Sequence, residues 1–194
     1  MRAGRCRGIT LCACLAVLVA CVWSPAAHAI GGTYTIRGGT KTERRVIVSA
    51  LEVSSFDWDV VPGPITIDIA RGIDSSAVRG HIWLDADLLD AGSFAMGVVQ
   101  HEYAHQVDFF LFDDFVHAQL LTELGAADWC GETPDVPHSA HGCERFASTL
   151  SWAYWPSREN CMRPISAKDE SAAMEPRRFR ALMQSLLMPL SSGG

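Results

Sequence analysis

Residues 101–105 read His-Glu-Tyr-Ala-His, which places two imidazoles four positions apart and a carboxylate next to the first of them. On a helix, side chains four positions apart lie on one face, one turn from each other. His101 and His105 could therefore both reach one zinc ion, with Glu102 beside a water molecule held by that ion. Zinc makes such a water easier to deprotonate, and a neighbouring carboxylate can accept its proton during attack on a carbonyl group. The spacing thus predicts a hydrolytic zinc centre.

The residues around this motif favour a buried helix. No proline or glycine occurs from Val98 through Phe112, and most of the side chains in that stretch are apolar. Burying charged groups without partners is costly, so the two histidines and the carboxylates of Glu102 and Asp108 need something to bind. A bound metal ion would be such a partner. The alternative, a helix that exposes its two histidines at the surface, fits the apolar neighbours less well. We expect one long helix over residues 94–110.

Zinc in a catalytic site usually has three protein ligands and an open position for water. Glu144 is the best candidate for the third ligand, because it begins a predicted helix about forty residues after His105. Ala147, one turn further on, is small enough to let that helix approach the zinc helix. The simpler alternative is an exposed carboxylate that the helix dipole stabilises at the start of its helix.

Three other side chains compete for the same role. Asp108 lies on the same stripe as both histidines, but one turn beyond His105, where it suits a hydrogen bond to a ligand better than the metal itself. His117 would reach the site only if the chain folded sharply back. His141 lies close to Glu144 in the sequence, and it could bind substrate or simply belong to a flexible loop.

Hydrolysis of a peptide bond also needs a hydrogen-bond donor for the oxyanion that forms. Four residues are candidates because of their side chains and their positions near the proposed ligands: Tyr103, His138, His141 and Tyr154. The sequence does not choose between them.

The motif in a helix, followed by Cys-Glu-Arg-Phe-Ala at residues 143–147 in a later helix, resembles the gluzincin branch of zinc metallopeptidases, in particular its small members. The resemblance covers residues 42–155 in the order of the elements. It implies that Zn²⁺ is bound by His101, His105 and Glu144, with Glu102 as the general base. It also implies that the substrate is a peptide or a protein.

The same resemblance implies an edge strand just before the zinc helix, on which extended substrate binds as an added strand. Residues 80–85, which read Gly-His-Ile-Trp-Leu-Asp, stand in that place. We therefore expect the substrate to contact Gly80, His81, Ile82 and Trp83. The alternative is that this segment is an ordinary strand of the sheet.

The wider pattern predicts an α+β domain. Alternating apolar and polar residues indicate strands over 65–69 and 80–85, while apolar spacing with capping and breaker residues indicates helices. We expect these helices over residues 42–53, 94–110, 115–128, 144–155 and 176–188, with a loop over 130–142. The predicted architecture is zincin-like: an N-terminal helix, a short β-sheet with an edge strand, the zinc helix, the glutamate helix and further C-terminal helices. Residues 42–194 form the predicted catalytic domain, and residues 30–41 a flexible arm before it.

The first 29 residues have the pattern of a signal peptide. Three arginines precede an apolar run over residues 9–22, and Ala-His-Ala at 27–29 fits a cleavage site. The run is too short for a membrane span. We expect a secreted protein, bacterial in the style of its leader. The alternative is a lipoprotein anchored through Cys21, because residues 18–21 resemble a lipoprotein signal.

Charge and cysteine content limit the partners and the compartment. After the leader, 13 basic and 22 acidic residues give a net charge of −9, which argues against nucleic acid or anionic lipid as a partner. Three cysteines follow the leader, at positions 130, 143 and 161. Outside the cytosol we expect two of them to pair, without an indication of which.

These observations predict a secreted zinc metallopeptidase that hydrolyses peptide bonds. One alternative is a non-catalytic extracellular module in which zinc serves stability or recognition. Another is a disulfide-linked interaction domain in which the motif arose by chance.

Overall fold

The computed structural model describes residues 32–131 and 133–187. They contain six α-helices and a sheet of four strands, which confirms the predicted α+β class. The predicted leader and Cys21 lie outside the described residues. No helix of the described part is both long and apolar enough to cross a membrane.

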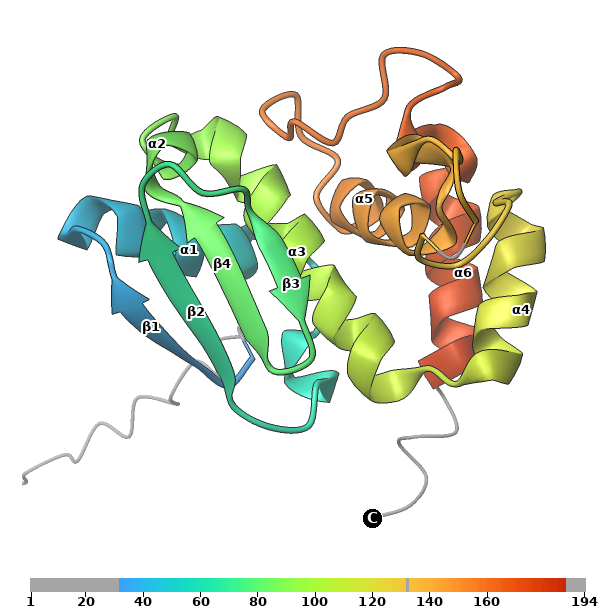
Figure 1. Ribbon diagram of the computed structural model, residues 1–194, viewed down its shortest axis with the longest axis horizontal. Coiled ribbons are helices and arrows are strands. Elements are labelled where there is room, and N and C mark those ends of the chain that lie inside the picture. The colour runs from blue at the N-terminus through green and yellow to red at the C-terminus, as the bar shows by residue number, and fades with distance from the viewer. Residues whose placement is uncertain (1–31, 132, 188–194) are drawn as a thin grey trace, which may run out of the picture.

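The sheet has the order β1-β2-β4-β3. Strands β1 (Tyr34–Gly38), β2 (Ile65–Ala70) and β4 (His81–Asp85) are parallel, and β3 (Ser76–Val78) pairs with β4 in the antiparallel direction. Helix α1 (Lys41–Val53) connects the parallel strands β1 and β2. In Figure 1 this helix and α3 (Ser93–Leu111) lie behind the sheet, and the other face of the sheet is open.

Alternation along β2 explains why one face of the sheet is covered. Ile65, Ile67 and Ile69 are buried, whereas Thr66 and Asp68 between them are partly exposed. Successive side chains of a strand point to opposite faces, so the three isoleucines pack toward the helices. This arrangement agrees with the strand that the sequence predicted over residues 65–69.

Helix α1 begins with a reciprocal cap. The Thr40 hydroxyl accepts a hydrogen bond from the Glu43 amide, and the Glu43 carboxylate accepts one from the Thr40 amide at 2.6 Å. This capping box satisfies two amides that would otherwise lack partners at the start of the helix. The helix was predicted from residue 42, and it instead begins at Lys41 with Thr40 as its cap.

Residues 34–38 correct the predicted flexible arm, because they form β1. The strand pairs with β2 in the register Tyr34 to Ile65 and Ile36 to Ile67. The glycines on either side of the segment suggested a loose arm. The strand lacks an alternating apolar pattern because it lies at an edge of the sheet and most of its residues are exposed.

The predicted edge strand is also wrong, because β4 lies inside the sheet between β2 and β3. The edge strands are β1 and β3, and β3 has only three residues. Gln106 holds its end through a hydrogen bond to the Val78 carbonyl and another to the Gly80 amide. A strand this short has too few residues to show alternation in the sequence.

Of the helices in the second half, α5 (Gly142–Tyr154) packs on α3, and α4 (Asp114–Leu124) and α6 (Pro176–Leu187) pack on α5. The short helix α2 (Ala86–Leu89) precedes α3. Three short 3₁₀ turns complete the described part: Trp58–Val60, His138–Ala140 and Glu170–Ala173. Helix α3 therefore lies between the sheet and the helical half, with α5 alongside it (Figure 1).

A disulfide joins Cys130 to Cys143. It ties the loop after α4 to the first turn of α5, immediately before Glu144. Cys161 is a free cysteine. The prediction that two of the three cysteines pair is confirmed, and the structure supplies the pairing that the sequence left open.

Gly97 allows α3 to lie close to α5 and to the segment that follows it. The Ser151 hydroxyl donates to the Gly97 carbonyl at 3.1 Å. A Cβ atom added at Gly97 would lie 2.3 Å from Asn160 Oδ1 and 3.1 Å from the Cys161 amide nitrogen. Asn160 cannot easily move away, because it is buried and donates to the carbonyls of Ser151 and Trp155.

Gly97→Ala should therefore lower the free energy of unfolding by about 1–3 kcal/mol, the usual cost of overfilling a packed site. Helix propensity alone would raise it by up to about 1 kcal/mol. Urea unfolding followed by circular dichroism distinguishes the two signs. A stabilised variant would show that α3 and the segment after α5 are not packed this closely.

Candidate functional site

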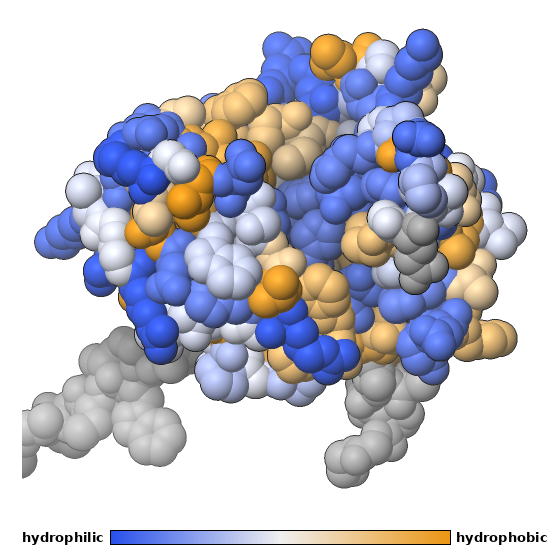
Figure 2. Space-filling model, viewed as in Figure 1, coloured by the Kyte–Doolittle hydropathy of each residue, from blue (hydrophilic) through white to orange (hydrophobic). Residues whose placement is uncertain are grey.

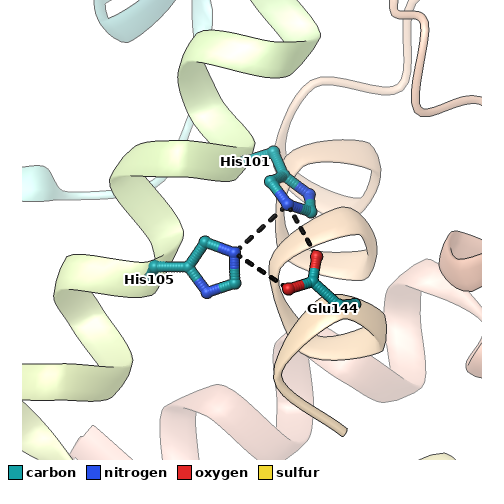
Figure 3. Close-up of side chains that lie close together, drawn as sticks. All are labelled: His101, His105 and Glu144. Atoms are coloured by element: carbon teal, nitrogen blue, oxygen red, sulfur yellow. Dashed lines mark hydrogen bonds and ion pairs between the residues drawn. The ribbon is translucent and has the colours of Figure 1, made fainter. Parts of the chain in front are cut away.

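Three side chains from two helices meet at one point (Figure 3). His101 and His105 lie on α3, and their Nε2 atoms are 3.2 Å apart. Glu144, in the first turn of α5, places one carboxylate oxygen 3.1 Å from His101 Nε2 and the other 3.7 Å from His105 Nε2. All three residues are buried or nearly so. The structure thus brings the three predicted ligands together.

Their spacing suits a metal ion. A tetrahedral ion with nitrogen and oxygen ligands at roughly 2.0–2.1 Å holds its donor atoms roughly 3.3 Å apart. The two imidazole nitrogens are 3.2 Å apart, and the two oxygens of Glu144 lie 3.1 Å and 3.7 Å from them, which is near that value. Two imidazole nitrogens and a carboxylate oxygen are also a donor set that zinc accepts. The residues present therefore fit a bound divalent ion.

Burial and neighbouring charges set the protonation states of the three groups. Burial, with a contribution from His101, lowers the pKa of His105 to about 3, so its imidazole is neutral at pH 7. Burial would raise the pKa of Glu144, but its hydrogen bond with His101 and the nearby histidine charges lower it to about 2. For His101, burial alone would lower the pKa, but the carboxylates of Glu144 and Glu102 outweigh burial and raise it. A cation bound here would displace the proton from His101, as metal binding generally does.

A chain of hydrogen bonds orients His101 from behind. Its Nδ1 lies 3.0 Å from the Ser148 hydroxyl, which donates to the Glu170 carboxylate at 2.6 Å. With Nδ1–H donating to Ser148, the His101 Nε2 lone pair faces the other two donors. Partners of this kind fix the ring and the tautomer of histidines that bind metals.

Glu102 lies in the same cavity as the three donors. Glu102 is only 6% exposed. Burial therefore raises the pKa of its carboxyl group to about 7, although the nearby His101 acts to lower it. The cavity has a volume of about 250 Å³ and reaches the edge strand, where Ser75, Ser76 and Ala77 line it. Figure 2 shows hydrophilic side chains in the recess between the sheet and the helical half. One cavity is therefore lined by the Glu102 carboxylate, by the three candidate ligands and by the start of the edge strand.

The three competing ligands have other partners. His117 Nε2 lies 2.6 Å from Asp108, and Trp129 Nε1 donates to the second oxygen of that carboxylate at 3.1 Å. The chain does fold back after α3, as a ligand role for His117 required, but the imidazole meets Asp108 instead. His141 pairs with Asp128. These contacts hold α4 and the 130–142 loop in place.

Of the four candidates for the oxyanion donor, only His138 lies at the cavity. Its Nε2 is 3.4 Å from Glu144, and its Nδ1 is 3.0 Å from Glu170. Tyr103 is fully buried against Trp58, and its hydroxyl has no hydrogen-bond partner among the described residues. Tyr154 lines a different cavity with Phe56.

The residues predicted to bind substrate do not line the candidate site. Gly80 donates to Gln106, and Ile82 is buried in the core. The imidazole of His81 contacts Asp68 at 2.8 Å and stacks on Trp83, with ring centroids 4.1 Å apart. Since His81 and Trp83 alternate with buried Ile82, they lie on the face of the sheet opposite the helices.

Three features of the site were missed in the sequence. Ser148 follows Glu144 by four residues, so helical spacing alone could have placed it on the same face. Glu170 lies in a 3₁₀ turn far along the chain, and no local pattern marks it. The third feature is the edge strand β3, because the edge strand was predicted over residues 80–85, which form the neighbouring strand β4.

Comparisons of this chain with family models, with curated proteins and with solved structures found no match.

Proposed function

We propose that this chain is a secreted, zinc-dependent metallopeptidase with a zincin-like architecture. The observation that carries the proposal is the convergence of His101, His105 and Glu144 in a cavity that also contains Glu102. A gluzincin-like enzyme requires an active-site helix, a glutamate on a following helix and an adjacent strand edge. The cavity gives each of these parts access to the same substrate.

Each side chain has a definite task in this proposal. His101 and His105 would hold the ion through Nε2, and Glu144 would hold it through its carboxylate. Bound zinc would supply Lewis acidity, which polarises a carbonyl group and makes a water easier to deprotonate. The Glu102 carboxylate would accept a proton from the attacking water. It would then donate that proton to the nitrogen of the departing amine.

The β3 edge would bind the backbone of the substrate. Residues 75–77 border the cavity beside the two histidines, and β3 pairs with β4 along one side only. An extended peptide could add to the free side through backbone hydrogen bonds. Antiparallel pairing is slightly more stable per residue than parallel pairing, so we take it as the binding direction.

His138 would be the donor to the carbonyl oxygen. It stands at the mouth of the cavity, with its side chain 71% exposed, and Glu170 orients its Nδ1 side. Its Nε2 lies 3.4 Å from Glu144, on the side of the ring that faces the candidate ligands, so an N–H at Nε2 would donate to a carbonyl oxygen bound beside them.

The position of Glu102 supports an enzyme over a module that binds zinc only for stability. A structural zinc site needs no buried carboxylate beside its ligands with access to a substrate groove, and structural zinc is usually enclosed by four protein ligands. The Cys130–Cys143 disulfide supports an oxidising compartment, in agreement with the secretory pattern of residues 1–29.

Zinc content tests the ligand set. Purified protein should retain one zinc per chain by elemental mass spectrometry, and Glu144→Gln should weaken zinc binding by at least tenfold because the ionised ligand is lost. Glu159→Gln changes the same charge at an exposed position and should bind zinc normally. Absence of stoichiometric zinc from the parent protein would refute the proposal.

Glu102→Gln tests the proton transfer. The amide has nearly the shape of the carboxylate but cannot accept the proton, so zinc should remain bound while hydrolysis of a peptide mixture falls by at least a hundredfold. Mass spectrometry of the products measures the loss. Full activity in this variant, on peptides that the parent cleaves, would contradict the assigned role of Glu102.

Ser148→Ala tests the hydrogen-bond chain behind His101. Removing the hydroxyl frees the imidazole to rotate and should weaken zinc binding by roughly 10–100-fold. Competition with a chromogenic chelator measures the affinity. Ser185→Ala removes an exposed serine hydroxyl on α6 and serves as the control. Equal zinc affinity in the two variants would mean that Ser148 does not position the ligand.

A further inference from the structure

A second cavity lies next to the candidate site, at the other side of Ser148. It has a volume of about 680 Å³, and Phe94 at the start of α3, Ser139, Ser148 and residues of the 158–171 segment line it. Ser148 and Glu170 form the boundary, since Ser148 contacts His101 and Glu170 contacts His138. The two cavities are therefore neighbouring parts of one active-site region.

Three cations line this second cavity: Arg158, Arg163 and Lys168. All three are exposed, and none of them forms an ion pair within residues 32–131 and 133–187. We call this set the cationic pocket.

The two carboxylates that also line the pocket are already engaged. Asp169 accepts hydrogen bonds from the Ile165 amide at 2.6 Å and from the amide and hydroxyl of Ser166, each at 2.8 Å. Glu170 accepts from Ser148 and contacts His138. The cations therefore keep their donors for a ligand from outside the protein.

The direction of β3 relates this pocket to a bound peptide. Along α3 the order is Phe94, His101, then Gln106, and Gln106 contacts the Val78 end of β3. Residues 75–77 border the candidate site with His101, while Val78 lies at Gln106, so β3 and α3 run the same way, with the Ser76 end of the strand toward the pocket. In Figure 1 the orange segment after α5 lies at the same end of the molecule as the start of α3. A peptide antiparallel to β3 would run with its C-terminal end toward the pocket.

We propose that the cationic pocket binds a carboxylate of the substrate on the C-terminal side of the bond that is cleaved. This inference rests on the proposed peptidase function and adds a substrate class to it. The carboxylate has two possible sources, an Asp or Glu side chain or the terminal α-carboxylate. Both would form charge-assisted hydrogen bonds with the guanidinium and ammonium groups.

The test uses two variants with equal changes in charge. One is Arg158→Gln/Arg163→Gln/Lys168→Gln. The control is Lys41→Gln/Arg45→Gln/Arg177→Gln, which removes three exposed cations that line neither cavity. Each zinc-loaded protein digests the same peptide mixture at low ionic strength, once with free and once with amidated C-termini. Mass spectrometry then maps every cleavage, and thermal unfolding checks that both variants are folded.

We expect the parent and the control to prefer peptides with a carboxylate on the C-terminal side of the cut. The pocket variant should lose that preference by roughly tenfold, as expected for a few solvent-exposed ion pairs, and still cleave neutral peptides. Asp or Glu enriched at interior positions would identify a side chain as the source. Cuts near the chain end that disappear on amidation would identify the α-carboxylate.

Two results would overturn the inference in distinguishable ways. Cleavage by the parent without any preference for a carboxylate, or an equal preference in the pocket variant, would refute the role of the pocket and leave the peptidase proposal intact. No zinc-dependent cleavage of any peptide would refute the proposed function, and the substrate class with it.

Discussion

The described structure depends on how two imidazoles and a carboxylate are accommodated in a nearly apolar interior. His101, His105 and Glu144 are largely removed from water, and their polar atoms lie between 3.1 and 3.7 Å apart. Such groups are costly to bury unless each has a partner. A shared cation would satisfy all three, and the histidine and carboxylate charges compensate one another in part without it. The same requirement explains the second layer, in which Ser148 contacts the remaining nitrogen of His101 and donates its own hydrogen bond to Glu170.

The fold positions this cluster by holding two antiparallel helices close together. Gly97 lets α5 and the following segment approach α3, with Ser151 donating to its carbonyl. The Cys130–Cys143 disulfide fixes the loop that precedes Glu144. On the opposite side, Gln106 attaches the end of β3 to α3, so the strand edge lies beside the helix that carries the histidines. The cavity therefore forms because α3 contacts α5 on one side and β3 on the other.

Local patterns in the sequence were sufficient for some parts of this arrangement. The i, i+4 spacing of His101 and His105 predicted that they share a helix face, and an apolar stretch without proline or glycine predicted the helix. Glu144 was found because a metal needs a third donor and the residue begins a helix. The meeting of Glu144 with the two histidines is a tertiary contact, which no local pattern shows and which the resemblance to gluzincins also implied.

Other parts depend on contacts that leave little local trace. Strand β3 has three residues, too few for an alternating pattern, so the edge was assigned to β4. Strand β1 is mostly exposed and flanked by glycines, and it was predicted as a loose arm. Glu170 reaches the site from a short turn late in the chain. Asp108, His117 and His141 do not join the site because Asp108 and His117 contact each other and His141 contacts Asp128. These contacts join residues that are 9 and 13 positions apart in the sequence.

A crystal structure of the zinc-loaded protein, with anomalous scattering recorded at the zinc edge, would show directly whether these three side chains share one ion. We expect one anomalous peak per chain, with His101 Nε2, His105 Nε2 and a Glu144 oxygen at roughly 2.0–2.2 Å from it and Glu102 facing its open side. An anomalous peak elsewhere, or none between the two imidazoles, would show that the three side chains do not form a zinc site.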